Sequence, residues 1–282
     1  MTDLTAGTGK AGPAAPGTTL GDWLRAAAAH TLVRRAFVLV LLAAAWQAAA
    51  VWQNNPLMLP SFLDTAAAFV DAVRSDQLME AAAASLGVLL KGYVVAIAIA
   101  LVFVSLAVAN GFVREVLQTL TAMFNPLPAI ALLPIALLWF GLGEKSLLFV
   151  QIHAVLWPFA LALLTGFEAV PETQRLVGRN YGLKGPSYVL RILVPAALPS
   201  ILSGLKIGWA FAWRTLIAAE LVFGMSSSQG GLGWFIYRNR NELLTDKVFA
   251  GLATVILIGL VVEVVLFRTI EAVTVRRWGM QR

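Results

Sequence analysis

Six apolar runs, each close to the length that a membrane-spanning helix needs, occupy most of this chain. They lie at roughly residues 35–52, 85–109, 122–141, 146–167, 198–223 and 248–267. A helix needs about 20 mostly apolar residues to cross the hydrocarbon core of a bilayer. Of the 282 residues, 59% are hydrophobic and only 13% are charged, far from the roughly 25% charged residues of soluble proteins. The sequence therefore predicts an all-α integral membrane protein with six transmembrane helices.

The N-terminal segment and the lack of cysteine limit the domain organisation and the chemistry of the chain. Residues 1–21 are small, polar and rich in Pro and Gly, without the apolar core of a signal peptide, so we expect a disordered cytoplasmic tail followed by one transmembrane domain over 22–282. The chain has no cysteine and only two histidines, His30 and His153. Disulfides and cysteine nucleophiles are excluded, and we expect no metal site.

The basic residues predict the orientation. With the N-terminus inside, the outer segments hold five basic residues, and the cytoplasmic segments hold thirteen: Lys10, Arg25, Arg34, Arg35, Arg114, Arg175, Arg179, Lys184, Arg191, Arg268, Arg276, Arg277 and Arg282. Cytoplasmic loops of membrane proteins carry an excess of Lys and Arg. We therefore expect both termini in the cytoplasm, and the basic character of the chain needs no nucleic acid to explain it.

The third apolar run, "TAMFNPLPAIALLPIALLWFGLG", contains Pro126, Pro128 and Pro134. Each proline removes a backbone donor, and non-helical backbone at membrane depth is tolerated only where protein buries it or where it lines a water-filled cavity. The run is predicted to face a substrate pathway, with Pro134 as a candidate lining residue, or to be an ordinary Pro-kinked packing helix.

The sequence "GLGEKS" that follows, residues 141–146, resembles a phosphate-binding loop only superficially. A true P-loop has a glycine immediately before its lysine, so that backbone N–H groups can surround phosphates. Glu144 takes that place here and would repel phosphate. We therefore expect a tight outer turn and no ATP binding by this chain.

A polar interruption between the fourth and fifth runs, about residues 172–195, has the pattern of a short helix, a break, and a second helical piece that ends at Pro195. Gly182 and Gly185 permit backbone conformations that side chains disfavour, and Pro186 can begin a helix. We expect a bent, exposed helical segment on the cytoplasmic side at which a partner docks. The alternative is a basic loop that only fixes topology and lies on anionic lipid.

This segment resembles the signature of the permease subunits of type I bacterial ABC importers. In that signature a Glu-Ala-Ala triplet precedes a glycine, which nine residues separate from Ile-x-Leu-Pro. Gly182 matches the glycine, Ile192 the isoleucine, and Val194–Pro195 the Leu-Pro pair, whereas Leu176–Gly178 departs from the triplet. Glu172 is a candidate substitute for the missing glutamate. The likeness runs from about Ser85 to Arg277, and "RNYGLKG" and "GLGWFI" look most like the nitrate, sulfonate and taurine importers.

The resemblance implies an assembly in a bacterial inner membrane. Two permease copies, expected to form a homodimer, would line the pathway, an external solute-binding protein would deliver the solute, and two ATPase subunits would hold the ATP and Mg²⁺. This chain itself would be neither an enzyme nor the holder of a cofactor. The residues expected to contact the ATPase are Arg179, Tyr181, Gly182, Leu183, Lys184, Gly185 and Pro195.

Ionisable residues inside predicted spans are costly and mark pathways or partners. Lys91 and Lys206 lie near enough to span ends to extend toward water. Arg214 and Glu220 lie deeper and, six residues apart, project about 120° from each other, so they cannot pair within their helix. Glu220 is a pathway candidate but is predicted more strongly to meet a donor on another helix or in the next outer loop. Arg214 is either a stopping point for an anion or part of an interhelical pair.

Two other classes were weighed, and the solute stays open. A membrane-embedded enzyme would need a nucleophile–base or metal constellation, and the chain lacks Cys, a histidine pair and clustered carboxylates within a span. A self-sufficient carrier or channel would often show an internal repeat, and none is convincing. For the importer, we predict a small oxyanion, with sulfonates such as taurine ahead of nitrate. Thiamine-precursor pyrimidines and aromatic carboxylates are the alternatives.

Overall fold

The computed structural model describes residues 31–75, 77–223 and 230–276, and the predicted tail lies outside them. The chain divides at Asn54 into two units. The described part of the first unit is one apolar helix, α2 (Thr31–Gln53), with Arg34 and Arg35 near its start. This helix corresponds to the first predicted span.

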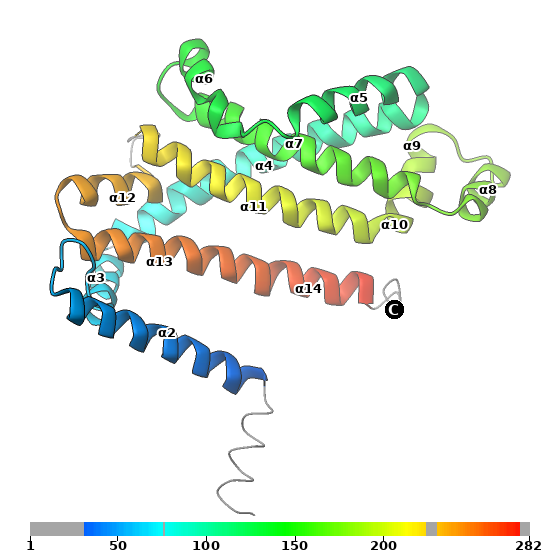
Figure 1. Ribbon diagram of the computed structural model, residues 1–282. Coiled ribbons are helices and arrows are strands. Elements are labelled where there is room, and N and C mark those ends of the chain that lie inside the picture. The colour runs from blue at the N-terminus through cyan, green and yellow to red at the C-terminus, as the bar shows by residue number, and fades with distance from the viewer. Residues whose placement is uncertain (1–30, 76, 224–229, 277–282) are drawn as a thin grey trace, which may run out of the picture. The chain divides into compact units, whose positions relative to one another are not determined.

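The described part of the second unit is helical as well, and its connections are short (Figure 1). Its first half consists of α3 (Phe62–Arg74), α4 (Gln77–Ala109), α5 (Gly111–Phe124), η1 (Ala129–Leu132), α6 (Leu133–Phe140) and α7 (Glu144–Glu168). The second half consists of α8 (Glu172–Asn180), α9 (Gly185–Tyr188), η2 (Val189–Leu193), α10 (Val194–Ala196), α11 (Leu198–Phe223), α12 (Leu232–Asn241), α13 (Thr245–Val261), η3 (Val262–Phe267), α14 (Arg268–Glu271) and η4 (Ala272–Arg276).

The long helices α4, α7 and α11 pack together at the centre of this unit, and α13 with α14 runs alongside α11 (Figure 1). Glycines set the spacing between α7 and α11. A Cβ on Gly166 would lie 2.5 Å from the Cβ of Ser200, and one on Gly204 would lie 2.7 Å from the Cβ of Ala162. Because the driving force for helix association in lipid is close packing, small residues at such crossings allow the backbones to approach.

Four helices are long and apolar enough to cross a membrane, and the number rises to six if each of two bent helix pairs counts as one span. The predicted fifth run, 198–223, coincides with α11, and the sixth continues through η3 and α14. The fourth run, 146–167, lies within α7, and the second within α4, which begins eight residues earlier, at Gln77. An all-helical membrane fold is confirmed.

The predicted third span, 122–141, corresponds to a pair of helical segments with a sharp bend between them. The helix begins earlier, at Gly111, where the side chain of Asn110 accepts hydrogen bonds from the N–H groups of Phe112 and Val113. It ends at Phe124, and after a break the chain turns by 90° into η1 and α6. The physical reason is that Pro126 and Pro128 cannot donate to a helical ladder. The prolines were recognised in the sequence, but the direction in which the chain turns was not.

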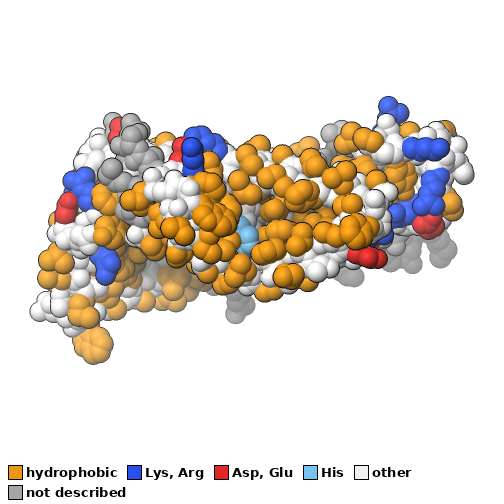
Figure 2. All heavy atoms as spheres, turned by 90° about the horizontal axis from the view of Figure 1, so that it is seen from above, with side chains coloured by type: hydrophobic (Ala, Val, Ile, Leu, Met, Phe, Trp, Pro, Cys, Tyr) orange, Lys and Arg blue, Asp and Glu red, His pale blue; other side chains and the backbone are white. Residues whose placement is uncertain are grey.

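Two short helices were not predicted. The first, α3, begins at Ser61, whose Oγ accepts a hydrogen bond from the N–H of Asp64 at 3.1 Å. The second, α12, follows Gly230 and Gly231. Both lie at the end of α4 and α13 opposite to α8 and α9 (Figure 1). The face seen in Figure 2 carries hydrophobic side chains over its middle and charged ones mainly toward its two ends, the pattern expected for a protein that crosses a bilayer.

Candidate functional site

A helical hairpin formed by α8 and the α9–η2 segment lies at one end of α7 and α11 (Figure 1). The two arms meet at Gly178, where an added Cβ would lie 2.8 Å from Cγ1 of Ile192 and 2.9 Å from the ring of Tyr188. Arg175 fixes the hairpin to α7, because its guanidinium donates to the backbone oxygens of Phe167 and Val170. The hairpin is thus a fixed feature of the fold, attached to the end of a long helix.

The turn of the hairpin is a glycine-terminated helix end. Gly182, with φ of 72°, follows the last turn of α8, and its N–H donates to Arg179 O while the N–H of Leu183 donates to Gly178 O at 3.0 Å. These two bonds form a Schellman motif, which needs a left-handed residue at the glycine position. Lys184 is extended, and Gly185, with φ of 54°, opens α9. The break predicted at these residues is therefore present.

The hairpin presents apolar side chains among charges. Tyr181 is 81% exposed, Leu190 is 66% exposed, and Leu176 and Val177 are about half exposed. Glu172 lies 3.4 Å from Nη1 of Arg179 and 3.9 Å from Nε of Arg175. The predicted contact residues from Arg179 to Gly185 come together in this turn. Pro195 lies apart from them in α10, just before the 82° bend into α11.

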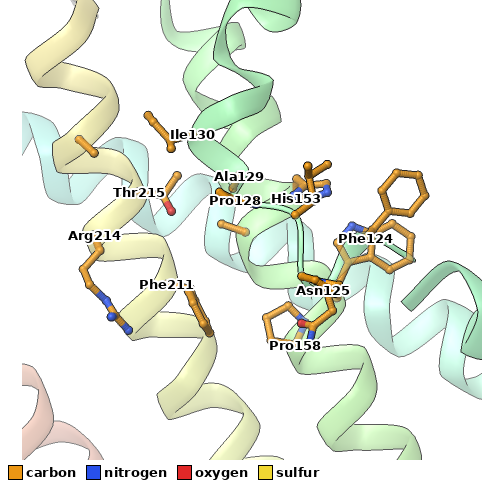
Figure 3. Close-up of a pocket in the computed structure, with 15 residues that line it drawn as sticks. Phe124, Asn125, Pro128, Ala129, Ile130, His153, Pro158, Phe211, Arg214 and Thr215 are labelled. Atoms are coloured by element: carbon orange, nitrogen blue, oxygen red, sulfur yellow. The ribbon is translucent and has the colours of Figure 1, made fainter. Parts of the chain in front are cut away.

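A cavity of about 510 Å³ lies where the break after α5 faces α7 and α11 (Figure 3). Its lining comes from three places: the Phe124–Ile130 segment, the His153–Pro158 part of α7, and the Phe211–Ala218 part of α11. Pro126 and Pro128 belong to the lining, but the predicted Pro134 does not, because it lies in the first turn of α6. The non-helical stretch after α5 thus borders a cavity, one of the settings in which such backbone is tolerated inside a membrane.

Arg214 borders this cavity and has no ion-pair partner among the residues that the structure describes. Its Nε donates to the backbone oxygen of Ala210 at 2.9 Å, and its guanidinium carbon lies 5.2 Å from the centre of the Phe211 ring. Figure 3 shows the side chain running along α11 past Phe211, away from Pro128 and His153. Both ring nitrogens of His153 are buried without a hydrogen-bond partner among the described residues.

Glu220 lies elsewhere, fully buried between three elements. Its carboxylate accepts hydrogen bonds from Ser85 Oγ at 2.9 and 2.8 Å and from the N–H of Gly233 at 2.8 Å. Ser85 Oγ in turn accepts from the N–H of Leu232 at 2.8 Å. A carboxylate at a helix N-terminus is favourable because unsatisfied N–H groups point at it. The prediction of a donor on another helix is confirmed, and Glu220 does not line the cavity.

Both lysines of the predicted spans have carboxylate partners that the sequence did not indicate. Lys206 Nζ lies 2.7 Å from Glu271 Oε2, and both side chains are mostly buried. The sequence predicted that Lys206 extends toward the end of its span, and in the structure its ammonium group meets a carboxylate on α14. Lys91, by contrast, is exposed and pairs at 2.6 Å with Glu144, the first residue of α7.

Comparisons with known proteins point in one direction. The family model described as "binding-protein-dependent transport system inner membrane component" matches residues 92–271. The chain is 30% identical to the taurine transport system permease protein of Escherichia coli over 229 residues, 79% of this chain and 82% of that protein. It is also 30% identical to a putative ABC transporter permease of Methanocaldococcus jannaschii, over 77% of this chain and 82% of that protein. The chain is likewise 30% identical to a nitrate import permease of Synechocystis, over 75% of this chain and 73% of that protein.

Proposed function

The chain belongs to the family of binding-protein-dependent transport system inner membrane components, and from this premise we propose how it takes part in ABC import. Two copies form the pathway, and each copy receives one ATPase subunit on the α8–α9 hairpin. A solute-binding protein delivers the solute on the opposite side. When the ATPases close on ATP and Mg²⁺, which this chain does not hold, the hairpins move together and the permease changes between two rigid-body states.

The observation that carries this proposal is the construction of the hairpin. It is attached to α7 through Arg175 and leads through α10 into α11, the two helices that border the cavity. Force applied at the turn is thereby passed to the cavity walls. Exposed Tyr181 and Leu190 supply the apolar contact that a protein interface uses.

Replacing Gly182 by Asp tests the hairpin. The substitution places a charge at the exposed turn, so we expect loss of uptake and of solute-stimulated ATP hydrolysis in the reconstituted complex, with the permease still inserted. Gly182→Asn separates the effect of the charge from the effect of an added side chain at the turn, because Asn tolerates the left-handed conformation and carries no charge. Gly111→Asp is the matched control, since that exposed glycine opens α5 with nothing within 4 Å of an added Cβ. Coupled turnover at the normal rate in Gly182→Asp would remove the hairpin from the mechanism.

For the solute we propose a small oxyanion, a sulfonate such as taurine ahead of nitrate. The similarity to taurine and nitrate permeases supports it, as does the position of Arg214 at the cavity. Guanidinium groups bind oxyanions through planar paired donors. Arg214 would therefore hold the anion briefly on its route.

Two measurements test this assignment. Thermal-shift screening of the cognate binding protein identifies the class of ligand, and an aromatic carboxylate or a pyrimidine among the stabilising compounds would redirect the proposal. Uptake of the identified anion by Arg214→Ala should fall at least tenfold. Arg240→Ala is the control, because that exposed arginine lies on α12 outside the cavity. Undiminished uptake by Arg214→Ala would show that the anion does not stop there.

A further inference from the structure

Two opposite charges within the membrane-spanning part have no ion-pair partner among the residues that the structure describes. The first is Arg214, whose guanidinium is held only by the backbone of Ala210 and the ring of Phe211. The second is Glu263, the only charged residue in the apolar run 248–267. The other two ionisable side chains of α11, Lys206 and Glu220, both have partners.

Arg214 and Glu263 lie equally many residues from an ion pair that joins two neighbouring antiparallel helices. The ion pair between Lys206 and Glu271, at 2.7 Å, fixes the register of α11 against α14. Arg214 follows Lys206 by eight residues, and Glu263 precedes Glu271 by eight. Eight helical residues rise about 12 Å, so both charges lie about the same distance from this ion pair. The contact between the rings of Trp209 and Phe267, 6.5 Å apart at their centres, agrees with this register.

They also lie on the same flank of the helix pair. Trp213 faces α13, since its Nε1 donates to Val255 O at 3.2 Å, and Val262 packs against the buried core. Each charge follows one of these inward-facing residues by one position. When two right-handed helices run antiparallel, the residue that follows an inward-facing residue lies on the same side of the pair in both helices. Glu263 lies within η3, a π-helical segment, and such segments occur frequently at functional sites.

We propose that Glu263 is the counter-ion of Arg214 in the same chain when the cavity holds no anion, and that the transported anion displaces it. The inference rests on the proposed anion stop at Arg214. An intramembrane charge without a partner is unfavourable, so Arg214 is stabilised by Glu263 before the anion arrives and after it leaves. Glu263 thereby competes with the anion and promotes its release, which makes it a positioning residue for the transport step.

Cross-linking tests the pair directly, because the chain has no cysteine. Arg214→Cys with Glu263→Cys, in the assembled complex, should form a link within one chain with a short bifunctional maleimide. Arg214→Cys with Val261→Cys is the matched control, since Val261 is exposed in α13 and, one position before the inward-facing Val262, lies on the opposite flank of the helix. A covalent dimer would overturn the same-chain pair in favour of one between two copies. Equal linking of the control, or none in either, would also overturn it.

A thermal-unfolding cycle separates this inference from the anion stop. Arg214→Gln and Glu263→Gln should each lower the melting temperature of the complex, and the double variant should lose less than the sum. Lys206→Gln combined with Glu263→Gln should be additive, because Lys206 pairs with Glu271. The maximal uptake rate of Glu263→Gln should fall at least threefold. If the losses of melting temperature add and Glu263→Gln leaves uptake unchanged, the counter-ion role is refuted. If the losses do not add but Arg214→Gln transports normally, only the anion stop is refuted.

Discussion

At the scale of single residues, the carboxylate of Glu220 joins three elements. Ser85 on α4 and the first turn of α12 both donate to this side chain from α11. The first turn of α12 comes this close only because it contains glycine: a Cβ on Gly231 would lie 2.2 Å from Glu220 Oε1, and one on Gly233 would lie 2.4 Å from Glu220 Cβ. A buried charge of this kind is tolerated because donors surround it.

Ser85→Ala tests that network. The change removes a donor to Glu220 and the acceptor for the N–H of Leu232, leaving buried polar groups unsatisfied, which costs about 1–3 kcal/mol each. We expect a clear fall in the melting temperature of the purified permease. Ser75→Ala is the control, since the Ser75 hydroxyl makes only a 3.3 Å bond to its own helix, at Ala72 O. Equal melting temperatures for the two variants would contradict the network.

Individual residues differed in how far the sequence could predict them. Gly182 was predicted to occupy a conformation that other residues disfavour, because a glycine after a short helical pattern is a local signal. Glu220 was predicted to meet a donor, because burial of a charge requires one. Ser85 was not identified as that donor, since 135 positions separate the two residues and nothing local marks a serine inside an apolar run.

At the scale of elements, the crossing of α7 and α11 depends on the absence of side chains. Gly166 and Gly204 lie at contacts that an added Cβ would bring to 2.5 and 2.7 Å from the opposite helix. These two helices form walls of the same cavity. Their separation therefore sets both the stability of the unit and the shape of the cavity.

Gly204→Leu is expected to force this crossing apart. Inserting bulk into a packed interface costs about 1–3 kcal/mol, so the melting temperature should fall and the cavity should change shape, with a loss of uptake. Gly87→Leu in α4 is the matched control, because an added Cβ there meets nothing within 4 Å. Stability as high as that of the control would mean that α7 and α11 can separate without loss.

Helices that are determined by residues close together in the sequence could be predicted, and helices that depend on distant residues could not. The α11 bounds were predicted because a long apolar run ends where prolines and polar residues begin. The path after α5 was not, since Pro126 and Pro128 break a helix without fixing the direction of the next one. The helix α12 was missed because its first turn is held by Glu220, from a different helix, and its ten residues are too polar to resemble a span.

At the scale of the whole molecule, transport requires that the α8–α9 hairpin and the α12 end face opposite sides of the membrane. The hairpin and α12 lie at opposite ends of α11 (Figure 1). The distribution of basic residues predicts that the hairpin lies inside. An ATPase can dock only on the cytoplasmic side, so the whole mechanism depends on this orientation.

Labelling of single cysteines tests the orientation in intact cells, and the chain suits it because it contains none. Lys184→Cys, in the exposed turn of the hairpin, should resist an impermeant maleimide added outside and react after the cells are opened. Arg240→Cys on α12 should react from outside in intact cells, since α12 follows the predicted outer loop. Both positions precede or end short helices in polar sequence, so neither change should disturb a span. Reaction of Lys184→Cys from outside would show that the topology is the inverse of the predicted one, and the hairpin could then not bind a cytoplasmic ATPase.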